Sequence, residues 1–530
     1  MAADHDVYVV SDLHLGEGWL PEQQRYARLE TFFYDTEFRN FAHAIIDDQL
    51  EKNRSATIVL NGDVFDFLAV VRLPDDASLR AAGLRLTRSE RKFGLGTTEE
   101  HAIWKMDRIL RGHREFVIAL AELLAAGHRL VVMRGNHDAE LFWDGVQRRF
   151  LDHLAQTAED EGVTQRGAAL LDRVEFRQWF LYEPGRYYIE HGNQYEASNA
   201  FRYVLNPVLP DEYHANRKTT LDYPIGSLFV RYLYNKMKLL DPFTTHFVTL
   251  DQYVRVTYHH NFMDLMRTGT VHFPFFFRAI RDARLFELQG MGPIKDVHEG
   301  RMATLRASSG LGAKLDELES MKSHPVGTTK YRLLTEMLRP VLRSALTFSS
   351  IGLLSVLCWF FIFATIQQTG WLAEGLVAKA SLLAILAVIT VVGLFIAFTF
   401  LNRALHNRAD PVVLHCYDRA ERIALLLDVP NVSMGHTHTA DFRDFKARPG
   451  HYANTGTWIP HPGPWDTVQP KARQFTFVRI VGTDMRLLRW DDANRRWQPV
   501  TLLEEYHPTA FERLLTDADG EHHPPGAEDI

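Results

Sequence analysis

Residues 6–14 read D-V-Y-V-V-S-D-L-H, a short β-rich run that ends directly in a carboxylate and an imidazole. Similar short β-rich runs follow at residues 57–60, 130–133, 187–189, 432–434, 475–481 and 485–490. Helical stretches separate several of these runs, as at residues 41–50 and 116–126. Strands that alternate with helices in this way predict an α/β fold built of packed layers.

A cluster of polar residues follows directly after each of five β-rich runs. They are S-D-L-H at 11–14, N-G-D-V-F-D at 61–66, R-G-N-H-D at 134–138, E-H-G at 190–192 and G-H-T-H at 435–438. Loops that leave the ends of strands are where α/β folds place their sites. Carboxylates, imidazoles and one amide, without a thiolate, suit Mn²⁺, Fe or Zn²⁺. The clusters therefore predict one metal site.

In this order the five clusters resemble the signature of the calcineurin-like metallophosphoesterases, which is D-x-H, G-D-x-x-D, G-N-H-D/E, H-G and G-H-x-H. The resemblance covers about residues 7–192 and 431–458, and it implies a β-sandwich flanked by helices that hydrolyses phosphoesters with two divalent metal ions. A similar subgroup is the UDP-diacylglucosamine hydrolases, which work at a membrane surface. The chain departs from that subgroup at His137, where Arg is usual, and at Asn193, where Asp is usual.

The resemblance assigns metal ligands and a catalytic pair. Asp12, His14 and His438 would hold one ion, Asn136, His191 and His436 would hold the other, and Asp63 would bridge both. His137 would stabilise or protonate the leaving oxygen, oriented by Asp138. Asp66 could orient a ligand and Arg134 could contact phosphate, but either could equally be an ordinary salt-bridged residue. Mn²⁺ is the expected metal, with Fe or Zn²⁺ as alternatives.

Two long apolar runs, 346–366 and 380–401, contain no charged residue. Each would span roughly 30 Å as a helix, which matches the hydrocarbon thickness of a bilayer. Arginines lie outside both runs, at Arg332, Arg339, Arg343, Arg403 and Arg408. By the positive-inside tendency, both outer ends are expected in the cytoplasm. The runs are therefore interpreted as a two-helix transmembrane hairpin, the alternative being a buried hairpin in a soluble core.

The hairpin and an aromatic stretch before it divide the expected catalytic domain. The predicted segments are 1–196 and 402–515 for its two parts, 197–345 for a helical insertion, 346–401 for the hairpin and 516–530 for a disordered tail. The insertion could form a lid or a lipid-facing platform through residues 275–277, or a plain helical core. Because the two parts must build one site, the number of membrane spans is expected to be even.

Composition narrows the choice of function. The formal net charge of −7 disfavours broad nucleic-acid binding, which needs a basic surface. The leading hypothesis is a membrane-anchored phosphoesterase with a cytoplasmic catalytic domain, acting on a lipid or lipid-linked phosphoester. The alternatives are a phosphodiesterase acting on nucleotides or nucleic acid, and a catalytically idle membrane scaffold that keeps the fold.

Overall fold

The computed structural model describes residues 5–75, 77, 86–163, 170–209, 219–235, 272, 274–279, 281, 291–325, 359–360, 364, 411–459 and 474–500. Contacts divide the chain into two units. The first joins Met1–Val248, Tyr253–Thr329 and Val412–Leu503, and it holds nearly all the described residues. The second groups Thr249–Gln252, Lys330–Pro411 and Glu504–Ile530.

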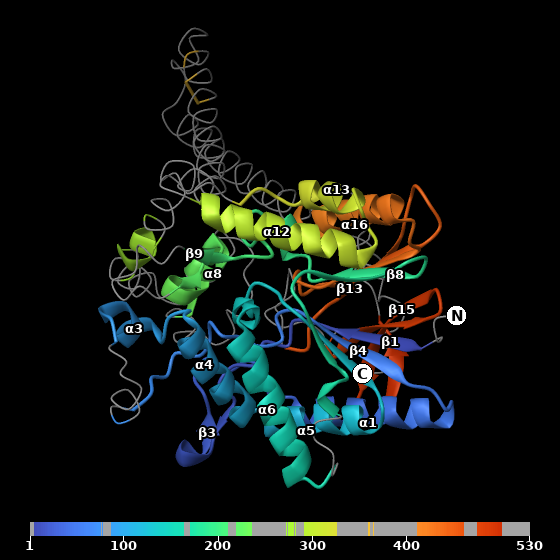
Figure 1. The fold of residues 1–530 in the computed structure, drawn as a ribbon, viewed down its shortest axis with the longest axis horizontal. Coiled ribbons are helices and arrows are strands. Elements are labelled where there is room, and N and C mark those ends of the chain that lie inside the picture. Colours follow the sequence, from blue (N-terminus) through green and yellow to red (C-terminus); the bar gives the residue numbers. More distant parts are fainter. Residues whose placement is uncertain are drawn as a thin grey trace, which may run out of the picture. The chain divides into compact units, whose positions relative to one another are not determined.

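A seven-stranded sheet contains the first β-rich runs of the chain, in the order β16-β15-β14-β1-β4-β5-β6 (Figure 1). Four neighbouring strands are parallel, namely β1 (Asp6–Val10), β4 (Ala56–Asn61), β5 (Arg129–Met133) and β6 (Val174–Arg177). Three strands continue the sheet in antiparallel pairing, namely β14 (Thr476–Val481), β15 (Asp484–Asp491) and β16 (Arg496–Pro499). Strands from both ends of the chain therefore share one sheet.

A second, five-stranded sheet has the order β12-β13-β11-β8-β7. Its strands are β7 (Phe180–Glu183), β8 (Tyr187–Glu190), β11 (Asn431–Met434), β12 (Ala440–Asp444) and β13 (His451–Thr455). The inner strands β8, β11 and β13 are parallel, and β8 pairs with β11 in the register Tyr187↔Asn431. This pairing joins the chain before the long insertion to the chain after it.

The alternation of side chains along β1 shows how the layers form. Val7 and Val9 are fully buried in a cluster that also contains Ile189 and Ala453 of the second sheet. Tyr8 and Val10, with the opposite side-chain direction, are buried against the helices. The two sheets therefore pack face to face, and helices cover the outer face of the first sheet.

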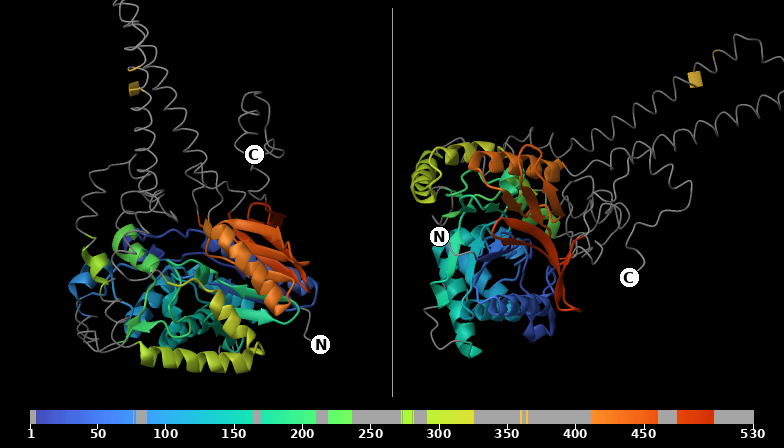
Figure 2. Two further views of the ribbon diagram at one scale, coloured as in Figure 1. Left: turned by 90° about the horizontal axis from the view of Figure 1, so that it is seen from above. Right: turned by 90° about the vertical axis from the view of Figure 1, so that its right-hand side faces the viewer.

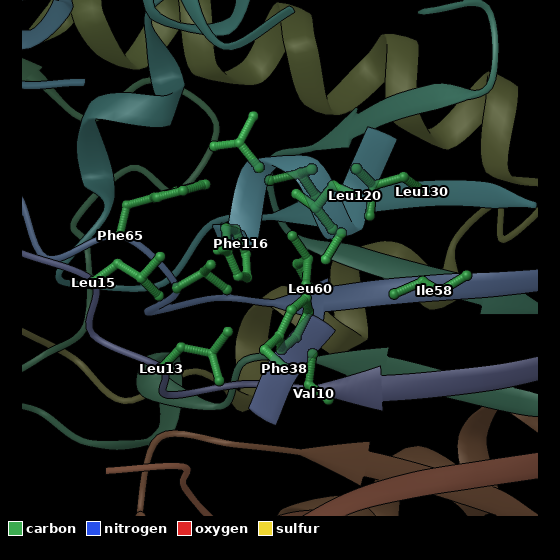
Figure 3. Close-up of a cluster of buried hydrophobic side chains, with 14 of the residues drawn as sticks. Val10, Leu13, Leu15, Phe38, Ile58, Leu60, Phe65, Phe116, Leu120 and Leu130 are labelled. Carbon is green, nitrogen blue, oxygen red and sulfur yellow. The ribbon is translucent and has the colours of Figure 1, made fainter. Parts of the chain in front are cut away.

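Helices cover both outer faces of the sandwich (Figures 1 and 2). Over the first sheet lie α1 (Asp35–Glu51), α4 (Glu99–Gly112), α5 (Arg114–Ala125) and α6 (Asp144–Asp160). Over the second lie α12 (Gly292–Ser309), α13 (Lys314–Met321) and α16 (Pro411–Leu427). Figure 3 shows the first of these cores, where Phe38 of α1 and Phe116 of α5 meet Val10 and Leu60. Burial of these large apolar side chains drives the layering.

The remaining elements that the structure describes in the first unit are shorter. They are β2 (Trp19–Leu20), η1 (Pro21–Gln23), β3 (Arg25–Tyr26), α3 (Arg88–Phe93), η2 (Ala139–Phe142), η3 (Asn193–Tyr195), β9 (Val208–Leu209), β10 (Thr220–Leu221), α8 (Ile225–Phe229) and the π-helix η5 (Val230–Tyr234). Thr98 is the N-cap of α4, and its hydroxyl accepts the N–H of His101 and so caps the first turn.

The predicted mixed α/β fold of sheets flanked by helices is confirmed. The predicted apolar runs, 346–366 and 380–401, lie outside the described residues apart from 359–360 and 364, and so does the tail 516–530. Among the residues that the structure describes, no helix combines the length and apolar character that crossing a membrane requires. The boundaries predicted for the segments stay predictions.

One part of the predicted aromatic insertion packs against α3. Phe276 is fully buried, and the ring of Phe275 lies 5.1 Å from the ring of Phe93 in α3. A buried side chain cannot face a lipid surface. For Phe276, the structure therefore favours a helical core over a lipid-facing platform.

Candidate metal centre

The five polar clusters lie on loops that leave the carboxyl ends of β1, β4, β5, β8 and β11. Because β1, β4 and β5 run parallel in one sheet, and β8 and β11 run parallel in the other, the loops of each sheet gather at one edge. The fold therefore brings together clusters that lie hundreds of residues apart in the sequence.

The first ligand group contains Asp12, His14 and His438, whose ligand atoms all lie within 4.8 Å of one another. His438 Nε2 is 3.2 Å from Asp12 Oδ1 and 3.0 Å from His14 Nε2. All three side chains are buried. Two imidazole nitrogens and one carboxylate oxygen facing a common point form a donor set that divalent transition metals accept.

The second group contains Asp63, His191 and His436, again with ligand atoms within 4.8 Å of one another. His191 Nε2 lies 3.2 Å from Asp63 Oδ2. Asp12 connects the two groups, because its Oδ2 accepts the backbone N–H of His436 at 3.0 Å. The structure thus assembles the six predicted His and Asp ligands into two adjacent sets.

Asn136, the seventh predicted ligand, follows β5 and is 2% exposed. Within the described part of the chain, its Oδ1 makes no hydrogen bond. The same holds for Asp12 Oδ1 and His191 Nε2, each of which instead faces another ligand of its group. Buried polar atoms ordinarily find a hydrogen-bond partner. Buried ligand atoms without a hydrogen-bond partner are therefore consistent with a role in binding metal ions.

The backbone at the ligands is strained. Five ligand residues have positive φ angles, namely Asp12 (53°), His14 (53°), Asp63 (51°), His436 (69°) and His438 (58°). Such conformations cost about 1–3 kcal/mol each in residues with side chains, and they cluster at functional sites. Hydrogen bonds between loops hold them: the N–H of Asp12 donates to the Gly62 carbonyl, and the N–H of His14 donates to the Asp63 carbonyl.

Gly62 allows two of these loops to approach each other. Its φ is +79°, and a Cβ at this position would lie 2.6 Å from Cγ of His191. A side chain there would be strained by the backbone and would push against a metal ligand. Glycine therefore allows the two loops to meet here without a clash.

His137 projects beside the two groups, but its carboxylate partner differs from the predicted one. Its Nδ1 lies 3.3 Å from Asp66 Oδ1. The carboxylate of Asp138 accepts the N–H groups of Gly135 and Val64 at 2.5 and 3.0 Å, so it fixes the backbone of two loops. Asp66 is therefore the residue placed to orient His137, and it also lies 3.8 Å from His14 Nδ1.

The charges around His137 change its acidity. Burial alone would lower the pKa of His137, but the nearby carboxylates of Asp66 and Asp63 outweigh it and raise the pKa to about 9. Burial would raise the pKa of Asp63, whereas His191 and His137 hold it well below its usual range. Asp138 differs, because burial and the charge of Asp63 raise its pKa to about 7. The site therefore keeps Asp63 ionised beside imidazoles.

Two ligand imidazoles have their second ring nitrogen occupied. His191 Nδ1 lies 2.9 Å from the Asn61 carbonyl oxygen, and His436 Nε2 lies 2.7 Å from Oε2 of Glu196. Contacts of this kind fix the tautomer and the direction of a ligating imidazole. Sequence analysis did not single out Glu196, since it lies outside the recognised motif and only its position shortly after His191 hints at the site.

Arg134, a predicted phosphate contact, is buried, and its guanidinium contacts backbone carbonyl groups. Its guanidinium donates to the carbonyl oxygens of Val204 and Gln178 and lies 4.9 Å from the ring centre of Phe201. Burial lowers its pKa to about 9. These contacts favour a structural role that secures the segment after η3, rather than a contact with phosphate.

Residues 5–224 match the family model described as calcineurin-like phosphoesterase. The chain carries a calcineurin-like phosphoesterase domain. This family indicates a metal-dependent phosphoester hydrolase, as the sequence predicted. No match was found among curated proteins, so the similarity to UDP-diacylglucosamine hydrolases stays a prediction.

The matched region of this phosphoesterase domain ends before two of its metal ligands. His436 and His438 lie beyond residue 224, yet the structure places them in the two ligand groups. The pairing of β8 with β11 explains this, because it sets the loop after Met434 beside the loop after Glu190. The catalytic unit therefore includes residues on both sides of the insertion.

Proposed function

We propose that this protein is a membrane-anchored phosphoesterase that uses two divalent metal ions, with Mn²⁺ as the native metal. The observation that carries the phosphoesterase activity is the meeting of Asp12, His14 and His438 beside Asp63, His191 and His436 at one edge of the sandwich. With Asn136, these residues would hold the ions. Bound in such a site, two metal ions activate a water molecule and clamp the phosphoryl oxygens during in-line displacement.

His137 is the proposed source of a proton for the leaving oxygen. Its Nδ1 faces Asp66, so Nε2 is the atom that can reach a substrate. Its side chain is 18% exposed, more than that of Asp66. A positioned imidazole of this kind contributes about 10²–10⁴ to the rate. Asp66 takes the orienting role that the sequence had given to Asp138.

Membrane anchoring is supported by the two uncharged apolar runs, 346–366 and 380–401, and by the arginines outside them. The active site supplies a second argument. His14 precedes these runs and His438 follows them, yet their ring nitrogens lie 3.0 Å apart. If the runs cross a bilayer, they must do so an even number of times, as a hairpin does.

The proposed substrate is a lipid or lipid-linked phosphoester. An anchored catalytic domain stays within a short distance of lipid head groups, which raises its effective concentration towards them. The net charge of −7 argues against nucleic acid as the substrate. A membrane hairpin that serves only for location is the competing interpretation.

The test is a substrate panel on the full-length protein, purified in detergent and reconstituted in vesicles, with Mn²⁺, Fe²⁺, Zn²⁺ or Mg²⁺ added. The panel compares soluble phosphomonoesters, nucleotides, phospholipids and nucleotide-linked lipids. We expect turnover of a lipid substrate in vesicles, greatest with Mn²⁺. Asp63→Asn removes a carboxylate oxygen from the second group and should abolish turnover while the fold is kept.

Three results would count against the proposal. Activity of Asp63→Asn near that of the unsubstituted protein would contradict the two-metal site. Turnover of soluble nucleotides, with none of any lipid, would replace the lipid substrate by a nucleotide. Absence of hydrolysis of every substrate would favour the hypothesis of a catalytically idle membrane scaffold.

A further inference from the structure

The loop after His191 contains a carboxylate that has no place in the recognised motif. Glu196 follows the short 3-10 helix η3 and lies 2.7 Å, through Oε2, from Nε2 of His436. Its side chain is 16% exposed, and that of His436 is 6% exposed. In the part of the chain that the structure describes, this is the one ion pair that Glu196 makes. A short contact between two largely buried groups is a strong charge-assisted hydrogen bond.

The carboxylate of Glu196 is itself held in place. Asn199 Nδ2 donates to Oε2 at 2.7 Å, and the hydroxyl of Ser198 donates to Oε1. The backbone N–H groups of Asn199 and Ala200 donate to the Glu196 carbonyl at 2.9 and 2.8 Å, which closes a tight turn. A carboxylate fixed from both oxygens can impose a direction on the imidazole that it contacts.

The same two loops are also joined through their backbones. The N–H of Gly435 donates to the carbonyl of His191 at 2.9 Å. Glu196 therefore comes from the loop that carries one ligand of the second group and contacts another ligand of that group, on the far side of the insertion. Because its contact occupies Nε2, Nδ1 of His436 remains as the ligand atom.

We infer that Glu196 is a positioning residue for the second metal ion, which orients His436 through Nε2 and leaves Nδ1 for the metal. This inference rests on the proposed dinuclear site. Carboxylates in this position fix the imidazole tautomer and raise its basicity, and their loss typically lowers metal affinity about 10–100-fold. The side-chain contacts described for Glu196 are with His436, Asn199 and Ser198, so the effect of Glu196 is expected at the second group.

Titration of metal-stripped, full-length protein with Mn²⁺ in a calorimeter, together with bound-metal analysis, tests this inference. Glu196→Ala should weaken one of two binding steps by about 10–100-fold and leave the other unchanged. Glu196→Gln should weaken it less, because an amide oxygen still accepts the Nε2 proton. The matched control is Glu319→Ala, which removes another carboxylate–imidazole pair, 2.9 Å from His298, between α13 and α12. It should change neither step.

A double-mutant cycle separates positioning from direct ligation. In a His436→Ala background, Glu196→Ala should cause no further loss of Mn²⁺ affinity, because its effect passes through the imidazole. A further loss of Mn²⁺ affinity in the His436→Ala background would overturn the inference while leaving the proposed function intact. So would a Glu196→Ala variant in which both Mn²⁺-binding steps keep their affinity. If the unsubstituted protein binds no metal, both the inference about Glu196 and the proposed two-metal function are wrong.

Discussion

The buried imidazole of His113, at the end of α4, makes stability depend on pH. Its Nδ1 lies 3.1 Å from Asp35 and its Nε2 lies 3.3 Å from Glu30. The carboxylate of Glu30 also accepts the backbone N–H groups of Gly16 and Gly18, in the loop that follows His14. The triad thus secures the backbone that leads away from the first ligand group.

The size of the effect follows from the charges around His113. Burial would lower the pKa of this imidazole, but Glu30 and Asp35 outweigh it and raise the pKa from 6.5 to about 10. A raised pKa in the folded state contributes stability below pH 6.5 that is lost as the pH rises through 10. At about 1.4 kcal/mol per pKa unit, the contribution falls by about 2.5 kcal/mol between pH 7 and pH 9.

The assay is urea unfolding of the full-length protein and of His113→Gln at several pH values from 6 to 10. We expect the variant to be less stable at pH 7, with a difference that shrinks by about 2.5 kcal/mol by pH 9. His43→Gln is the control, because His43 is 46% exposed and makes a surface ion pair with Glu122. A difference between His113→Gln and the unsubstituted protein that stays constant with pH would refute the reasoning.

Three substitutions near the metal centre give further predictions. His137→Ala should keep both ions but lower kcat by about 10²–10⁴, and metal analysis showing a parallel loss of metal would make His137 a ligand. Ser227→Ala removes the hydroxyl that donates to the Asn136 carbonyl at 3.1 Å, so it should cost about 1–3 kcal/mol in denaturant unfolding and lower activity in a way that excess Mn²⁺ restores. Gly62→Ala places a Cβ 2.6 Å from Cγ of His191, so it should reduce bound metal, and normal metal content in that variant would show that the loop adapts.

The strands and the metal loops could be predicted because both depend on local sequence. The predicted run at 57–60 lies within β4, and the run at 130–133 lies within β5, each ending in its polar cluster. Parallel pairing then brings their carboxyl ends to one edge. The pairing of β8 with β11 could be inferred only from the chemistry of the site, since the long insertion removes any local signal for it.

Side-chain direction was harder to predict than position. Asp138 follows His137 directly, and this adjacency suggested that the two interact. In the structure, the Asp138 carboxylate accepts the N–H of Val64, whereas Asp66, far away in sequence, meets His137. His137 and Asp138 lie in the loop between β5 and η2, where adjacent side chains need not share a direction, so adjacency alone does not identify a partner. The sequence did not identify Glu196 as a site residue for a related reason, because only the folded turn brings it to His436.

Three residues near the beginning of the predicted insertion donate hydrogen bonds to the part of the chain that precedes it. Ser227 of α8 donates to the Asn136 carbonyl, Arg231 of η5 donates to the Gly94 carbonyl at 2.8 Å, and Asn235 donates to the Leu68 carbonyl at 2.7 Å. All three donors are buried. Breaking such bonds leaves buried carbonyl oxygens unsatisfied, so this segment cannot move away from the metal loops without a large cost in free energy. The beginning of the insertion is therefore tied to the loop that contains Asn136 and to the segment that follows Asp66.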